Sequence, residues 1–244
     1  MPADAPTILA TSGGIRRGSR TTWAFAPLIH FGVELAGVTG RAPRICYVGT
    51  AGGDQSWHAS LFEEAARSVD MVPSLAMVYP MPNYDDMAAH LLGQDLIWVG
   101  GGSVANLLAL WRLHGLDSAL HSAWQAGVVL AGVSAGSLCW HLGGTTDSFG
   151  PDLQRVDALG WLPYSNGVHY DNEAQRRPLF QRLVAEGSLP MGYATDDGVG
   201  LYYRGTELVE AVSEVRGKGA YVVHREGDAA VEERLEPRLL PDAG

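Results

Sequence analysis

The segment Gly127–Ser137 constrains the fold of this 244-residue chain more than any other part of it. It is a continuous apolar run with β-branched valines that ends abruptly at Ser134, and further apolar residues follow from Leu138. This order is typical of a buried parallel strand, a tight turn and a helix. Gly132 and Gly136 flank the serine in the G-x-S-x-G pattern of a nucleophile elbow. The segment therefore predicts a reactive serine at a strand end, the alternative being a serine that only caps the helix.

Segments typical of strands and helices alternate along the first 145 residues. Alternation at this interval predicts an α/β fold with a mostly parallel sheet covered by helices on both faces. In such sheets the active site lies at the carboxyl ends of the strands, where Ser134 and two glycine-rich turns fall. The expected strands are 7–11, 44–50, 75–79, 95–99 and 127–133, and the expected helices are 23–35, 56–69, 85–92, 104–113 and 116–125.

Beyond residue 145 the pattern weakens, and turn residues dominate 145–151. A helix is expected over 177–186, and four short strands are expected over 191–194, 199–203, 208–212 and 220–224. Glycine-containing turns between these strands predict a C-terminal antiparallel extension. We interpret residues 1–244 as a single α/β domain and expect residues 236–244 to fray.

Composition excludes several classes of protein. A net charge of -10 argues against a nucleic-acid binder, which needs a basic face. The sequence has no apolar run of about eighteen residues and no signal-peptide pattern, so we expect no membrane span and a cytoplasmic location. Cys46 and Cys139 fall in segments expected to be buried, which favours packed thiols over a disulfide or metal site. No cofactor is expected.

An elbow serine needs a base, and the base needs an orienting acid. Among eight histidines, His169 stands in the polar segment 164–173, which is expected to be a loop after the elbow helix. A structural role is expected for the six that fall in or near expected helices, which are His30, His58, His90, His114, His121 and His141. His224 falls in the C-terminal strand region. The sequence spacing does not choose among the candidate acids Asp196, Asp197, Asp147, Asp171 and Glu173.

Acyl transfer also needs N–H donors for the developing oxyanion. The elbow supplies one from Ala135, and the triple-glycine turn Gly100-Gly101-Gly102 is expected to supply a second. The competing interpretation of this turn is a phosphate cradle. The sequence lacks both G-x-G-x-x-G and a following Lys-Thr or Lys-Ser pair, so this interpretation is the weaker one.

Three motifs in order resemble the peptidase E (aspartyl dipeptidase) and cyanophycinase family of serine peptidases. They are Val99-Gly100-Gly101-Gly102-Ser103 before Asn106-Leu107-Leu108, then Gly132-Val133-Ser134-Ala135-Gly136-Ser137, then Leu162-Pro163 ahead of His169-Tyr170. The similarity extends from the first strand to about Gly198. The resemblance implies a fold like the class I glutamine amidotransferases and a Ser-His-acid triad that cleaves peptide bonds in very short substrates.

Carried over to this chain, the resemblance makes Ser134 the nucleophile and His169 the base. Gly101 and Ala135 become the oxyanion N–H donors, and Gly102 lies beside the substrate. The family's glutamate before a glycine falls on Asp197, which we therefore prefer as the acid. Aspartate is one methylene shorter, so the loop of His169 would have to lie closer to it.

The segment after the histidine departs from the family pattern. The aspartyl dipeptidases carry an arginine there, in a longer segment, that binds the N-terminal aspartate of the substrate. Arg176 and Arg177 are the candidates here, but neither aligns with it cleanly, and a solvated helix start is the interpretation we favour for the pair. Aspartyl specificity is lost if neither arginine points into the pocket.

These observations predict a serine hydrolase that cleaves short peptides, like a dipeptidase, through an acyl-enzyme on Ser134. One alternative is an esterase or amidase acting on another small acyl group. The other is a small-ligand binding protein that uses the same scaffold without turnover. A homodimer is expected only because it is the commonest oligomer.

Overall fold

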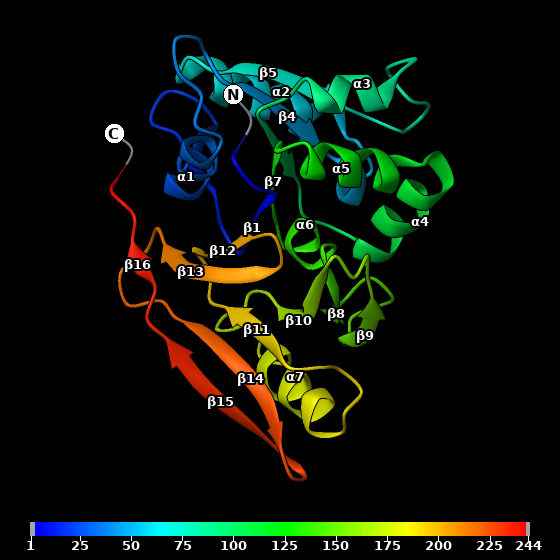
Figure 1. Cartoon of the computed structure of the whole chain (residues 1–244), viewed down its shortest axis with the longest axis vertical. Helices are drawn as coiled ribbons and strands as arrows, with labels where there is room; N and C mark the ends of the chain where they lie inside the picture. Colours follow the sequence, from blue (N-terminus) through cyan, green and yellow to red (C-terminus); the bar gives the residue numbers. More distant parts are fainter. Residues whose placement is uncertain (1–2, 243–244) are drawn as a thin grey trace.

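Two β-sheets, one above the other in Figure 1, organise the computed structural model, which describes residues 3–242. The larger one, here called the main sheet, has eight strands in the order β16-β13-β12-β1-β7-β6-β4-β5. Its strands are β1 (Thr7–Thr11), β4 (Arg44–Val48), β5 (Val72–Ala76), β6 (Leu96–Val99), β7 (Val129–Val133), β12 (Val199–Arg204), β13 (Glu207–Ser213) and β16 (Arg238–Leu239). The run β1-β7-β6-β4-β5 is parallel throughout. The mostly parallel sheet expected from the sequence is confirmed.

Helices cover both faces of the main sheet because consecutive strand residues point to opposite sides. Ile8 and Leu130 pack in one apolar cluster with residues of α4 and α5, whereas Leu9 and Val129 pack in another with residues of α1 and α2. All four strand residues are fully buried, as a continuous apolar run requires. The helices are α1 (Pro27–Leu35), η1 (Thr50–Gly52), α2 (Ser56–Ser68), α3 (Met87–Leu92), α4 (Val104–His114), α5 (Leu116–Gln125), α6 (Ala135–Leu138) and α7 (Arg176–Ala185).

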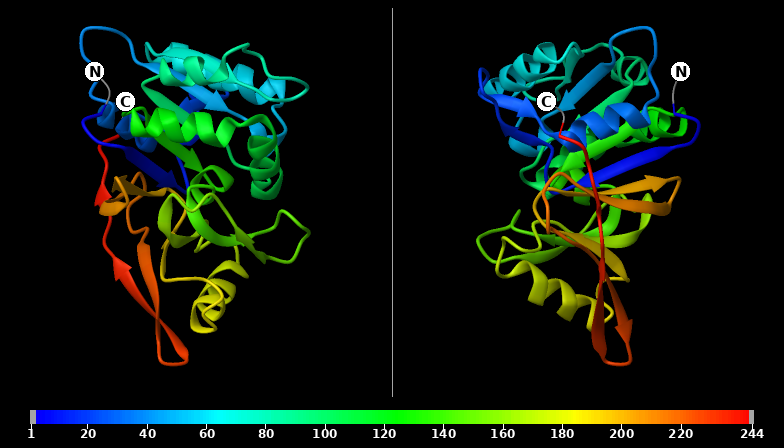
Figure 2. Two further views of the ribbon diagram at one scale, coloured as in Figure 1. Left: turned by 45° about the vertical axis from the view of Figure 1, so that its right-hand side comes forward. Right: turned by 90° about the vertical axis from the view of Figure 1, so that its left-hand side faces the viewer.

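The smaller sheet, here called the second sheet, has six strands in the order β15-β14-β11-β10-β8-β9. Its strands are β8 (His141–Thr146), β9 (Gln154–Asp157), β10 (Leu162–Gly167), β11 (Gly192–Thr195), β14 (Ala220–Glu226) and β15 (Ala229–Leu235), while β2 (Ile15–Arg17) and β3 (Trp23–Phe25) form a separate hairpin. The antiparallel C-terminal strands are present, with β12 and β13 at the main sheet and β14 and β15 at the second. Figure 2 shows the chain returning from β15 to β16 along the side of the molecule.

The elbow helix is shorter than the sequence suggested. The apolar residues from Leu138 onward were expected to continue the helix, but α6 ends at Leu138 and His141 already lies in β8. Close strand packing explains the change, since a Cβ at Gly144 would lie 2.1 Å from the carbonyl oxygen of Asn166 in β10. The segment 145–151, expected to be all turn, begins with the last two residues of this strand.

Three further expectations are corrected. The strand expected over 75–79 is shifted to β5, and the helix expected over 23–35 divides into β3 and α1, which begins at Pro27 because proline suits the first turn. The C-terminal residues do not simply fray, because β16 forms and Leu240 is 5% exposed. Residues 243–244 of that segment lie outside the described part of the chain. Within residues 3–242, no helix has the length and apolar character needed to cross a bilayer.

Candidate active site

The elbow around Ser134 is tightly packed. Ser134 connects β7 to α6 with φ 58° and ψ -113°, a conformation that L-residues rarely adopt. A Cβ at Gly136 would lie 2.2 Å from the carbonyl oxygen of Val99 and one at Gly132 would lie 2.5 Å from that of Gly136, so both positions require glycine. The hydroxyl of Ser134 makes no capping hydrogen bond to the helix. The alternative that this serine only caps α6 is therefore not supported.

The triple-glycine turn lies against the nucleophile. A Cβ at Gly101 would be 3.2 Å from the Cβ of Ser134, and Gly102 has φ +137° with its Cβ position 2.3 Å from the carbonyl oxygen of Ala51. Only glycine allows this approach. Among residues 3–242, the backbone N–H of Gly101 has no protein acceptor, and neither has that of Ala135, the first residue of α6. Two free N–H groups thus lie next to Ser134, as an oxyanion site requires.

His169 and Asp197 form a hydrogen-bonded pair. Nδ1 of His169 lies 2.5 Å from Oδ1 of Asp197, and Asn172 donates from Nδ2 to the other carboxylate oxygen at 2.9 Å. A carboxylate accepts only, so Nδ1 carries the hydrogen and Nε2 is left to accept a proton when the ring is neutral. His169 lies two residues after the end of β10, and the first four residues of the segment expected to be a loop, 164–167, are strand. No hydrogen bond joins its ring to the Ser134 hydroxyl within the described chain, although both residues line one pocket.

Two other candidate acids, Asp196 and Glu173, bind groups other than the imidazole. Asp196 accepts from the backbone N–H of Gly219 at 2.8 Å and from the Tyr221 hydroxyl at 3.3 Å, and burial raises the pKa of this carboxyl group above its ordinary value. Glu173 forms an ion pair with Arg176. The geometry therefore favours Asp197 as the partner of the imidazole.

Asp171 holds the backbone of Asp197 in the His169–Asp197 pair. Its Oδ1 accepts the backbone N–H of Asp197 at 2.9 Å, and its Oδ2 forms an ion pair with Lys218. Burial alone would raise the pKa of the Asp171 carboxyl group, but the hydrogen bonds from Lys218 and Asp197 outweigh it and lower that pKa. Asp171 is thus a fixed anion that holds the acid's backbone and does not itself contact the imidazole.

The pocket at the nucleophile has a volume of about 480 Å³. Its wall combines the main sheet, through Ser134 and the start of α4, with residues that follow β8 and β10 of the second sheet. The lining residues are Gly102, Ser103, Asn106, Ser134, Asp147, Ser148, His169, Glu173 and Arg176. The pocket thus contains two carboxylates and one guanidinium.

Arg176 is buried, which corrects the expectation of a solvated helix start. Its side chain is 3% exposed and donates to the carbonyl oxygen of Thr145 and to Glu173, while Nε is buried without a partner in the described structure. Burial lowers the pKa of this guanidinium despite the nearby carboxylates of Glu173 and Asp147. Each terminal nitrogen of Arg176 therefore already makes a hydrogen bond within the protein.

Arg177 lies outside the pocket. Its guanidinium pairs with Glu232 of β15 and stacks over the rings of Tyr170 and Tyr221, 4.9 Å from the centroid of the latter. Asp147, by contrast, is exposed at the pocket and its carboxylate has no hydrogen-bond or ion-pair partner among the described residues. The unsatisfied charge beside the nucleophile is therefore negative.

Sequence reasoning missed Ser103, Asn106 and Ser148 as pocket residues. Ser103 could have been found from its place directly after the glycine turn, where it caps α4 by accepting from Asn106 N at 3.3 Å. No sequence pattern marks Ser148 as a pocket residue, because only the fold of β8 brings it to the pocket. Its hydroxyl contacts α4 by accepting from the backbone N–H of Ala105 at 3.3 Å.

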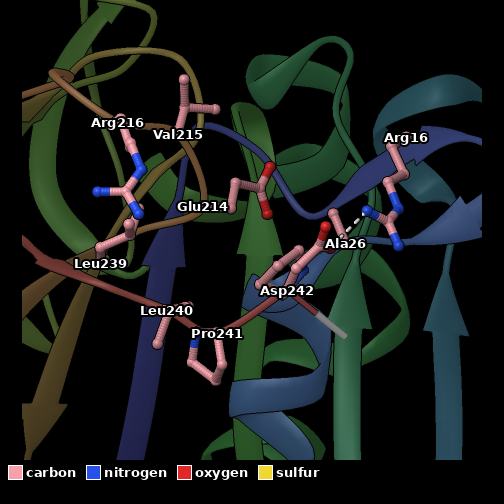
Figure 3. A pocket seen from close by; sticks show the side chains of 10 residues that line it. Arg16, Ala26, Glu214, Val215, Arg216, Leu239, Leu240, Pro241 and Asp242 are labelled. Atoms are coloured by element: carbon pink, nitrogen blue, oxygen red, sulfur yellow. Dashed lines mark hydrogen bonds and ion pairs between the residues drawn. The ribbon is translucent and has the colours of Figure 1, made fainter. Parts of the chain in front are cut away.

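A larger cavity of about 690 Å³ lies between α1 and the end of β13 (Figure 3). Three of its four charged side chains already have partners: the carboxylate of Glu214 accepts from the backbone N–H groups of Gly14 and Leu28, and Arg16 pairs with Asp242. It offers no nucleophile, so the chemistry belongs to the smaller pocket.

Both cysteines are free, buried thiols, as expected, and burial raises the pKa of the Cys46 thiol to about 12. A thiol of that acidity is a poor nucleophile at neutral pH. No group of three or more potential metal ligands occurs within residues 3–242. Ser134 is thus the nucleophile candidate that the geometry supports.

Comparison with known proteins places these features in context. The model of Peptidase family S51 matches residues 10–211. The chain is 42% identical over 181 residues to the "Uncharacterized peptidase YgaJ" of Bacillus subtilis (strain 168), an alignment that covers 74% of this chain and 78% of that protein. The match includes both strands that carry the glycine turn and the elbow, and it extends past the His169 and Asp197 segments.

Two solved structures have a similar fold. A peptidase from an acI-B1 Actinobacterium superposes with a TM-score of 0.66 at 15% identity, covering 96% of this chain and 95% of its own. A putative peptidase E protein from Listeria monocytogenes EGD-e superposes with a TM-score of 0.60 at 18% identity, covering 86% of this chain and 98% of its own. At such identities the likeness concerns the fold alone, and it confirms the α/β architecture expected from the sequence.

Proposed function

Because the chain belongs to peptidase family S51, and is therefore a hydrolase of peptide bonds, we propose that it cleaves short peptides through an acyl-enzyme on Ser134. One observation carries this proposal: His169, which is hydrogen-bonded to Asp197, lines the same pocket as Ser134, next to two backbone N–H groups without acceptors. Nucleophile, base, acid and oxyanion donors are the parts that acyl transfer requires.

The reaction follows from this geometry. Nε2 of His169 removes the proton of Ser134 as Oγ bonds to the carbonyl carbon, and the N–H groups of Gly101 and Ala135 stabilise the oxyanion. Asp197 accepts from Nδ1 and stabilises the imidazolium. The imidazolium then donates its proton to the leaving amine as the C–N bond breaks. Water, activated by the same histidine, hydrolyses the ester and restores the serine.

Charge in the pocket supports a short substrate with a free amino terminus. The unpaired carboxylate of Asp147 shares the pocket with Ser134, where it suits the α-ammonium group of a peptide whose scissile bond is near its start. The terminal nitrogens of Arg176 bind Thr145 and Glu173, and Arg177 lies outside the pocket. We therefore propose a dipeptidase-like activity without a preference for N-terminal aspartate.

Substitution of the nucleophile tests the mechanism. Ser134→Ala should lower kcat for dipeptide hydrolysis by about 10⁴-fold or more, because the triad acts as a unit. Purified wild-type protein should also be modified stoichiometrically by a serine-reactive phosphonate, with the adduct on Ser134 by mass spectrometry. A protein that only binds ligands would leave the phosphonate unreacted. Faster turnover of p-nitrophenyl esters than of every dipeptide in a panel would support an esterase instead.

A further inference from the structure

The end of β1 makes a hydrogen bond to the segment of each proposed triad member. The carbonyl oxygen of Thr11 accepts the backbone N–H of Ser134 at 3.1 Å. The hydroxyl of Ser12 accepts the backbone N–H of His169 at 3.1 Å, and its carbonyl oxygen accepts that of Gly198, the residue after the acid, at 2.9 Å. Three segments far apart in the chain therefore share one anchor.

The hydroxyl of Ser12 has a defined role in this anchor. Ser12 is buried and its Oγ lies 2.7 Å from Oγ1 of Thr195, which is also buried, in β11. Thr195 in turn accepts the backbone N–H of Tyr170 on its carbonyl oxygen at 3.0 Å. The backbone of His169 and Tyr170 is thus held by two bonds, one to Ser12 and one to Thr195.

His169 needs such support because of its backbone conformation. Its φ is +52°, one of only four positive values at non-glycine positions among the described residues, and Ser134 has another. Positive φ is unfavourable for L-residues with a side chain and persists only where surrounding contacts hold it. The bond from His169 N–H to Ser12 is the contact nearest to the strained dihedral angle.

The turn after Ser12 packs against Glu214 and the segment of Gly198. A Cβ at Gly13 would lie 2.5 Å from Oε1 of Glu214 and 2.8 Å from Cα of Gly198, so the three segments are in direct contact. Glu214 accepts from Gly14 N at 3.0 Å and donates its own N–H to the carbonyl oxygen of Gly198 at 2.9 Å. Figure 3 shows the side chain of Glu214 among the residues that line the adjacent cavity. The anchor cannot shift without displacing the segment of the acid.

We infer that Ser12 is a positioning residue, whose hydroxyl fixes the imidazole of His169 relative to Ser134 and Asp197; this inference rests on the proposed function. Removing the hydroxyl leaves the His169 N–H without its acceptor and releases the strained turn. Misplacement of a catalytic group by about 1 Å can cost about 100-fold in rate. The effect should fall on the chemical step, since Ser12 does not line the pocket.

The test compares three variants in steady-state kinetics with a dipeptide substrate. Ser12→Ala should lower kcat by about 10- to 100-fold with KM within about twofold of wild type. Ser12→Thr keeps the hydroxyl and should recover most of the lost kcat. Ser74→Ala is the matched control, because Ser74 lies in the distant strand β5 and the change removes a serine hydroxyl that bonds to Gln94 at 3.1 Å. This control should leave both parameters unchanged.

Wild-type kcat in folded Ser12→Ala, or a loss confined to KM, overturns the inference. If Ser12→Ala does not fold, Ser12→Cys decides, because the thiol is nearly isosteric but a weaker acceptor for the His169 N–H. Reduced kcat at unchanged KM then supports the inference, and unchanged kcat overturns it. A failure of the proposed function is separate: in that case Ser134→Ala remains active and no phosphonate adduct forms.

Discussion

The main sheet and the second sheet contribute different parts of the candidate site. The main sheet holds Ser134 at the end of β7 and the glycine turn at the end of β6, both in short connections packed against other backbone. The second sheet holds His169 after β10, between the buried residues Val168 and Tyr170, and it holds the exposed Asp147 after β8. The nucleophile, the oxyanion donors and the base are thus held by packed backbone, whereas the charge of Asp147 belongs to an exposed segment that can vary without altering the elbow.

Asp197 lies between β11 of the second sheet and β12 of the main sheet. Its substitution removes the carboxylate that orients His169 of the second sheet towards the nucleophile of the main sheet. In Asp197→Asn the side chain can donate to Nδ1 and stabilise the wrong tautomer, and kcat should fall by about 10⁴-fold. The neighbouring Asp196→Asn is the control, because Asp196 bonds to Gly219 and Tyr221 of the β14 segment. It should reduce stability while kcat stays near the wild-type value. Equal losses of kcat in both variants would contradict the assignment of the acid.

His141 connects the two regions and should make their association sensitive to acid. Its ring is fully buried in β8, with Nδ1 donating to the carbonyl oxygen of Ser137 at 3.0 Å and Nε2 accepting from Tyr203 of β12 at 3.3 Å. Burial lowers the pKa of His141 from 6.5 to about 4. The unfolded chain therefore binds a proton in this window that the folded chain does not.

Stability should accordingly decrease as pH falls from 6.5 towards 4, by roughly 2–3 kcal/mol from this group. Urea unfolding at pH 7 and pH 4.5 measures the loss of unfolding free energy between the two pH values. In His141→Gln this loss should be smaller by roughly 2–3 kcal/mol. Several carboxyl groups titrate in the same range, so the difference between the two proteins is the informative quantity. An identical pH dependence in both would show that His141 is not buried in its neutral form.

The smallest effect is expected at Asp147, where the second sheet meets the substrate. Asp147→Asn should raise KM for dipeptides by about fivefold, which corresponds to the 1 kcal/mol or less of an exposed ion pair. The N-acetylated dipeptide lacks the ammonium charge and serves as the matched substrate, since its KM should not respond to the substitution. Added salt should weaken the effect. A similar change for both substrates would exclude recognition of the ammonium group by this carboxylate.

The same division explains what the sequence could predict. The elbow and the main-sheet strands are local patterns of apolar and small residues, and their positions agree closely with β1, β6 and β7. The centre of the second sheet has no such pattern: β10 includes Ser165, Asn166 and Gly167, which are buried because neighbouring strands pack closely on them. A Cβ at Gly192, for example, would lie 2.1 Å from the Ser165 hydroxyl. Such strands are specified by tertiary pairing.

Charged residues show the same limit. Arg176 and Arg177 are neighbours with the same chemistry, yet one is buried beside Thr145 and the other pairs with Glu232. Asp196 and Asp197 likewise face opposite partners, because successive residues leaving a strand point to opposite sides. Only the folded chain distinguishes the members of such pairs, and the resemblance to a family with a glutamate at the second position is what favoured Asp197.

The pairing of β1 with β12 has a consequence for biosynthesis. The first strand from the N-terminus acquires its antiparallel neighbour only when residues 199–204 are available, and the acid at 197 immediately precedes them. A nascent chain leaving the ribosome therefore carries its serine long before it can carry a complete triad. On the mechanism proposed here, hydrolysis begins only after synthesis has passed this strand, so truncated or half-made copies remain harmless to the peptides around them.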